Sequence, residues 1–174
     1  MRPRESVRAV AYPAVLGAVA LMLVYLASLA PTGSWGIVAL AGICPAGVRI
    51  CVGLRGSLLC WGGVSLLALL LIPDKFCALL FALLFGLYPV VKSAIEGLRR
   101  RWAEYLLKLL FFNAAFTALF LLMGAAMLDT LPQVLSVGGW VLYLVANIVF
   151  LLYDYGLSKV IALYIVRIHS VIRR

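Results

Sequence analysis

Six long apolar segments, separated by short connections, run through the chain. Lipid offers no hydrogen-bond partner to a free backbone N–H or C=O, so only helices or closed barrels cross it. The segments do not alternate with period two, which excludes a barrel, and most approach the roughly 20 residues that a crossing helix needs. The pattern predicts one all-α domain over residues 1–174, an integral membrane bundle of six transmembrane helices. The predicted spans are 9–30, 35–48, 52–72, 76–91, 105–128 and 134–153.

The composition agrees with a bilayer as the solvent. The chain is 66% hydrophobic and 12% charged, whereas a soluble domain carries about 25% charged residues. Its net charge of +9 sits at segment ends and not in a solvated patch. We therefore expect attraction to anionic lipid headgroups and no binding of nucleic acid.

The basic residues predict the orientation. If the N-terminus is cytoplasmic, fourteen of the fifteen lysines and arginines lie inside and only Lys75 lies outside. This asymmetry is what the positive-inside rule requires. We expect both termini in the cytoplasm, in a multi-pass protein of the inner (plasma) membrane. Arg99, Arg100 and Arg101 then form a cytoplasmic basic face.

Two cytoplasmic segments are predicted to be structured. Charged residues spaced four apart favour a helix over 92–108, with a bend at Gly97. The tail, 156–174, places its apolar residues on one face and its basic residues on the other. This predicts an amphipathic basic helix that lies on the inner leaflet or folds onto the bundle.

Two asparagines are the best polar candidates inside the spans. Asn113 and Asn147 lie at similar depths, roughly 10–12 Å from the inner surface at about 1.5 Å per residue. Adjacent antiparallel helices would bring them into hydrogen-bonding contact. The pair either stabilises the packing of the two helices by about 0.6 kcal/mol, or forms part of a polar ligand-binding pocket.

Asp154 is the third candidate. We expect it to pair with a cation at the inner rim, and Arg49, Arg55 and Lys92 are the nearest choices. The pair would be structural, or it would act as a gate or coupling contact. All acidic residues lie at or beyond the predicted span boundaries, which disfavours a proton-driven pump.

Prolines and small residues within the spans predict where helices are interrupted and where they approach closely. Pro45 and Pro89 interrupt the second and fourth spans, as kinks or as discontinuities that expose backbone groups. Small residues permit close approach, either between the helices of this chain or to another subunit. They are Ala14, Ala18, Gly62, Gly63, Gly138 and Gly139.

The sequence offers little for catalysis. The four cysteines form no Cys-x-x-Cys, His169 is the only histidine, and no phosphate-binding loop motif occurs. We predict no catalytic residue, no metal site, no cofactor and no enzymatic activity.

The size, the six spans and the alanine pattern of the first helix resemble small six-helix bacterial membrane proteins. These include the substrate-binding S components of energy-coupling-factor transporters. Ala14 and Ala18 match an Ala-x-x-x-Ala that, in that family, docks to the coupling subunit. The segments 70–75 and 152–157 also look like families of this kind.

The resemblance implies a non-enzymatic transport subunit. It would bind a small solute and rely for energy on coupling or ATPase subunits docked at the basic inner face. One alternative is a structural or assembly scaffold of cell-envelope machinery, and a membrane enzyme is the third. A transport subunit needs a cavity between spans, a scaffold would be packed solid, and an enzyme would bring titratable groups together at Asp154, His169 or a cysteine.

Overall fold

The computed structural model describes residues 3–98, 100–129 and 139–172. These residues are almost wholly helical and contain no strand. Four long helices are α1 (Pro3–Leu29), α4 (Leu54–Leu71), α7 (Arg101–Asp129) and α8 (Gly139–Ile172). Shorter pieces are α2 (Ser34–Ala41), α3 (Ile43–Cys51), α5 (Lys75–Leu80), a π-helix η1 (Phe81–Phe85), α6 (Tyr88–Ile95) and a 3₁₀ turn η2 (Glu96–Leu98).

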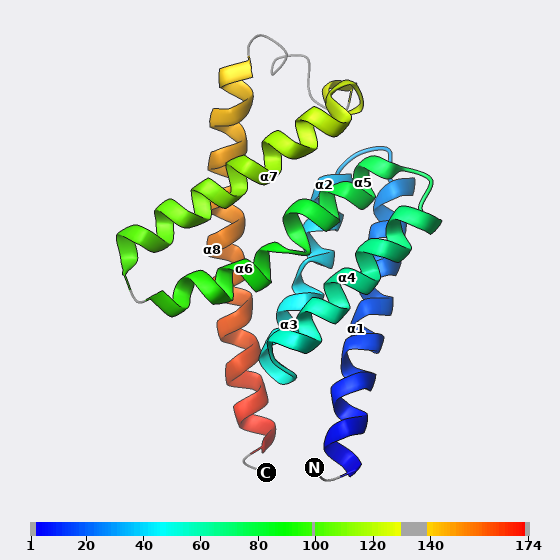
Figure 1. Ribbon diagram of the computed structural model, residues 1–174, viewed down its shortest axis with the longest axis vertical. Coiled ribbons are helices and arrows are strands. Elements are labelled where there is room, and N and C mark those ends of the chain that lie inside the picture. Colours follow the sequence, from blue (N-terminus) through cyan, green and yellow to red (C-terminus); the bar gives the residue numbers. More distant parts are fainter. Residues whose placement is uncertain (1–2, 99, 130–138, 173–174) are drawn as a thin grey trace.

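Six stretches of the described chain are long and apolar enough to cross a membrane. They are Val10–Leu29, Ser34–Cys51, Leu54–Leu71, Lys75–Ile95, Arg101–Gly124 and Trp140–Val166. Large apolar side chains such as Leu59, Leu70 and Leu121 are exposed on the outer surface, where lipid suits them. The predicted all-α fold, with six helices long and apolar enough to cross a membrane, is therefore confirmed. The start of α1 and the end of α8 lie at the same end of the molecule, as six crossings require (Figure 1).

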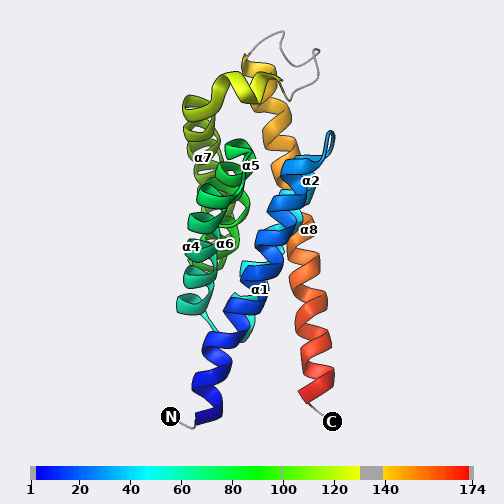
Figure 2. The same ribbon diagram turned by 90° about the vertical axis from the view of Figure 1, so that its right-hand side faces the viewer.

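The helices pack as a bundle around the fourth span. Helix α1 packs against α2, α3 and α4, while α7 crosses in front of α8 in Figure 1. The fourth span lies at the centre, where Leu80, Phe81 and Tyr88 are almost completely buried. Helix α8 packs against α3 and α7, and Figure 2 shows α4 on the opposite side of the bundle from α8.

The second and fourth spans are both broken, and their breaks pack together. Pro45 has no N–H for the carbonyl of Ala41, and the second span bends at Gly42. Pro89 likewise has no N–H for the carbonyl of Phe85, at the end of η1. A Cβ on Gly42 would lie 2.5 Å from the Phe85 carbonyl oxygen. The two irregular segments thus meet backbone to backbone, and the interruption predicted for both spans is confirmed.

Side chains satisfy carbonyl groups near these breaks. The indole of Trp61 on α4 donates to the carbonyl of Ala82 at 2.9 Å, and the Ser57 hydroxyl donates to that of Pro45 at 2.8 Å. Such partners are needed because lipid supplies none. Helix α4 therefore supports both irregular segments.

Lys75 is the basic residue that the charge pattern places apart from the others. Its ammonium donates to the carbonyls of Leu69 at 2.8 Å and Ile72 at 2.9 Å. These carbonyls lie at the C-terminal end of α4, where the helix dipole favours a cation. The ammonium group of Lys75 is therefore held at the end of α4.

The predicted end of the sixth span differs from the structure. Helix α8 continues without a break from Gly139 to Ile172, so no separate helix begins at Gly156. The expectation took Asp154 as the membrane boundary, but its charge is neutralised inside the bundle, so the helix need not end there. At about 1.5 Å per residue, α8 is longer than the roughly 30 Å of hydrocarbon.

The connection before α7 is also shorter than expected. Helix α6 ends at Ile95 and α7 begins at Arg101, so the helix predicted over 92–108 is divided into two helices. The chain turns through η2, which contains Gly97, and the bend predicted there is confirmed. This turn brings Lys92 and Lys108 onto the same carboxylate, as described next.

Candidate functional site

Four charged side chains form a closed ring inside the bundle. Lys92 on α6 contacts Asp154 on α8 and lies 3.0 Å from Glu96 of η2. Lys108 on α7 lies 2.8 Å from Glu96 and 3.3 Å from Asp154. Each contact joins opposite charges, so the ring is formally neutral. We call these four residues the ion ring.

The ion ring is buried at three of its four members. The side chains of Lys92, Lys108 and Asp154 are 2%, 8% and 11% exposed, and that of Glu96 is 43% exposed. Lys92, Lys108 and Asp154 all lie within the apolar stretches that can cross a membrane. Charges survive such burial only when they are paired and hydrogen-bonded. Glu96 gives the ring its contact with the molecular surface.

Two hydroxyl groups complete the ion ring. Tyr88 donates to Asp154 Oδ1 at 2.5 Å, and Lys92 donates to Ser158 Oγ at 2.8 Å. The oxygens of Asp154 therefore accept from Tyr88, Lys92 and Lys108. Both oxygens of the carboxylate therefore have donors from the chain itself.

The pairing predicted for Asp154 is confirmed with Lys92, one of the three cations named. Arg49 instead donates to Ser93 at 2.9 Å, and Arg55 is exposed. The second partner, Lys108, was not expected. Its signal was visible in the sequence, because Lys108 interrupts the apolar run 106–110 and a lone cation there needs a buried anion. The expectation that no acidic residue lies within a span is wrong for Asp154.

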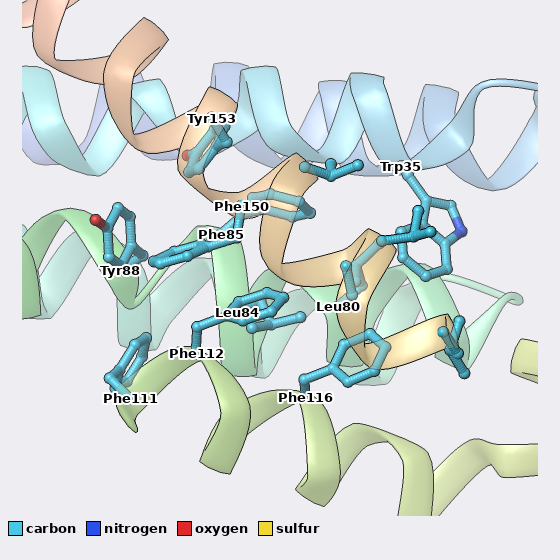
Figure 3. Close-up of a pocket in the computed structure, with 14 residues that line it drawn as sticks. Trp35, Leu80, Leu84, Phe85, Tyr88, Phe111, Phe112, Phe116, Phe150 and Tyr153 are labelled. Carbon is cyan, nitrogen blue, oxygen red and sulfur yellow. The ribbon is translucent and has the colours of Figure 1, made fainter. Parts of the chain in front are cut away.

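An apolar cavity of about 200 Å³ lies next to the ion ring. Its walls come from α2, α5, η1, α6, α7 and α8 (Figure 3). The lining residues are Trp35, Leu80, Leu84, Phe85, Tyr88, Phe111, Phe112, Phe116, Leu142, Val145, Ala146, Val149, Phe150 and Tyr153. The sequence gives no signal for this site, because its residues are ordinary apolar ones drawn from four spans.

The aromatic rings of the cavity pack on one another. Phe112 stacks on Phe150 with ring centroids 4.3 Å apart, and Phe150 meets Tyr88 edge-on at 4.9 Å. Phe85 meets Tyr153 edge-on, also at 4.9 Å. Offset and edge-on pairs are favourable geometries that hold rings in place. Tyr88 belongs to both sites, since its ring lines the cavity and its hydroxyl bonds the ion ring.

Asn113 and Asn147 form a reciprocal pair between α7 and α8. Their amides exchange hydrogen bonds of 3.0 and 3.1 Å, and each also donates to a carbonyl of its own helix, those of Leu109 and Tyr143, at 2.8 Å. The predicted contact is confirmed. Neither residue is among those lining the cavity, and their role in ligand binding stays a prediction.

The small residues named for packing mostly face outward. Ala14 and Ala18 are exposed, and a Cβ on Gly62 or Gly63 would meet nothing within 4 Å. Close packing within the chain is therefore wrong for these two glycines, while docking to another subunit stays a prediction. Gly138 lies outside the described residues, and Gly139 is the first residue of α8.

The remaining predicted groups are peripheral. Arg100 and Arg101 are exposed at the start of α7, and Arg99 lies outside the described residues. Cys44, Cys60 and Cys77 are buried as free thiols, and Cys51 is exposed. In the part of the chain that the structure describes, no three His, Cys, Asp or Glu residues gather to hold a metal ion.

No family model, curated protein or solved structure matches this chain. Its function therefore has to be argued from the ion ring, the cavity and their surroundings.

Proposed function

We propose that this chain is a non-enzymatic subunit of a membrane transport system, which binds a small solute in the cavity between its spans and relies on partner subunits for energy. The cavity of about 200 Å³ is the observation that carries this proposal. A binding subunit requires a hollow between its helices, and residues of several helices line this cavity. A scaffold has no use for such a space.

The energetic cost of the cavity supports a binding role. If such a space stayed empty, the residues that line it would lose van der Waals contacts. The lining is built from large rings, which do not collapse into the space. A ligand that fills it recovers the missing contacts.

The pairing of Asp154 supports a non-enzymatic role. The titratable groups of the ion ring do lie close together around Asp154, as a membrane enzyme would require. However, both carboxylate oxygens accept from side chains of the ion ring or from Tyr88, which leaves no free base beside the cavity. Instead, the ion pairs of the ion ring hold α6, α7 and α8 together next to the cavity.

The outward-facing small residues support a partner subunit. Ala14 and Ala18 on α1, and Gly62 and Gly63 on α4, present surfaces that approach another helix closely. The same surfaces would serve a scaffold, which remains the second candidate. Purification from native membranes in mild detergent is expected to recover a coupling or ATPase subunit with this chain. Recovery of the bare chain would count against a transport system.

We also propose that both termini face the cytoplasm, on the strength of the basic residues. With Cys51 replaced by serine, a cysteine at exposed Thr32 is expected to react with an impermeant maleimide added outside intact cells. A cysteine at exposed Arg100 is expected to react only after the cells are opened. The opposite pattern would invert the topology.

Filling the cavity tests the binding role. Ala146 lines the cavity, so Ala146→Phe is expected to displace the small molecule that copurifies with the protein in nanodiscs. Mass spectrometry of the extract should show a loss of at least about tenfold, since a ring in the space removes its volume.

Ala162→Phe is the matched control, because Ala162 is exposed on the same helix. It is expected to retain the copurified compound at the wild-type level. A wild-type protein that carries no compound, or an Ala146→Phe variant that carries as much as the wild type, would contradict the proposal.

A further inference from the structure

The cavity wall presents rings and alkyl groups and no free charge. Eight of its fourteen lining residues are aromatic, and the other six are Leu, Val or Ala. Among the described residues, the charged group hydrogen-bonded to the cavity wall is Asp154 of the ion ring, in which each charge is already paired. An ion in this cavity would lose its hydration without gaining a counter-charge.

The two tyrosines of the wall do not offer their hydroxyl groups to the cavity. The Tyr88 hydroxyl is held by Asp154 at 2.5 Å, and that of Tyr153 points toward the carbonyl of Ala39, 3.5 Å away. Figure 3 shows both oxygens at the outer edge of the cluster of rings. The interior is therefore close to hydrocarbon in character.

Val149 is the most exposed residue of the cavity wall. It lines the cavity and is 54% exposed, which makes it the best candidate for the opening of the cavity. Val149 lies nine residues after Trp140 in the stretch Trp140–Val166, about 14 Å along the helix. An opening at this position would admit a molecule from the hydrocarbon without passage through water.

From these observations we propose that the ligand is an uncharged, apolar molecule with one or two flat rings, and that it enters sideways from the bilayer beside Val149. The inference rests on the proposed binding role of the cavity. An apolar cavity of about 150 Å³ in a soluble protein stays dry and accepts benzene, so about 200 Å³ accommodates one or two fused rings. Offset stacking on Phe112 and Phe150 would hold a flat ring.

The test uses two matched probes and fluorine NMR. The protein in nanodiscs is mixed with 1-fluoronaphthalene or with the anionic 4-fluoro-1-naphthoate, and empty nanodiscs give the background. The neutral probe is expected to show a protein-dependent resonance shifted by the surrounding rings, at least about tenfold more populated than that of the anion. Ala146→Phe should abolish this resonance, and Ala162→Phe should leave it.

The route of entry of the neutral probe is tested by substitutions at and near Val149, where we place the opening of the cavity. Val149→Trp is expected to slow exchange of the neutral probe at least about fivefold, whereas Leu152→Trp, at an exposed position outside the cavity lining, should leave the rate unchanged. Equal exchange in both variants would overturn lateral entry. Binding of the anion at or above the level of the neutral probe would overturn the ligand class while leaving solute binding intact. Absence of any resonance sensitive to Ala146→Phe would overturn the inference, and the copurification experiment then judges the binding role separately.

Discussion

Replacing Lys92 with methionine is expected to lower the free energy of unfolding by about 3–5 kcal/mol, the range for removing one partner of a buried ion pair. Methionine preserves most of the volume but leaves Asp154, Glu96 and Lys108 with a net negative charge in a buried place. Unfolding in mixed micelles, or by steric trapping in bicelles, measures the change.

Two variants make this prediction specific. Lys159→Met removes a lysine from an exposed position on α8, so it should change stability by no more than about 0.5 kcal/mol. The double variant Lys92→Met, Asp154→Leu leaves the neutral pair Lys108–Glu96 and should recover most of the loss. A single variant as stable as the wild type, or a double variant as unstable as the single one, would show that charge balance does not hold the helices together.

Replacing Gly42 with alanine is expected to cost about 3 kcal/mol, at the upper end for overpacking a buried site. The new methyl group would lie 2.5 Å from the Phe85 carbonyl oxygen and 2.9 Å from the Tyr153 hydroxyl. The first of these is backbone and cannot rotate away, so the second and fourth spans must separate. Phe85 and Tyr153 line the cavity, and the separation should therefore also weaken probe binding.

Gly62→Ala is the matched control for this substitution. Gly62 lies inside α4 with nothing within 4 Å of the position of a Cβ. Alanine is favoured over glycine in a helix by about 1 kcal/mol, so this variant should be unchanged or slightly more stable. Equal effects of the two substitutions would mean that the second and fourth spans do not meet at Gly42.

Some contacts could be predicted because few partners were available. Asn113 and Asn147 were paired correctly since amides inside apolar helices at similar depth have few other partners. Lys92 was named among three cations for Asp154 on similar grounds. The choice among the three depended on how α6 and α8 are placed, which charge counting does not reveal.

The cavity and the continuation of α8 past Asp154 could not be predicted from the number of available partners. Phenylalanines at 85, 112 and 150 read as ordinary membrane-helix residues, and nothing in their spacing says that they face a shared space. Asp154 looked like the end of a span because an unpaired carboxylate would have to leave the lipid. Pairing with Lys92 and Lys108 removes that requirement, and α8 continues.

The amino-acid sequence by itself determined that the chain is helical and that it forms six apolar stretches, because the bilayer requires every backbone group to be bonded within its own segment. It also located the broken spans, since proline lacks the N–H that the preceding turn needs. Only the tertiary structure decided which charges share the ion ring and where a hollow remains. Both depend on contacts between residues as far apart as 88 and 154, and local pattern carries no information about such contacts.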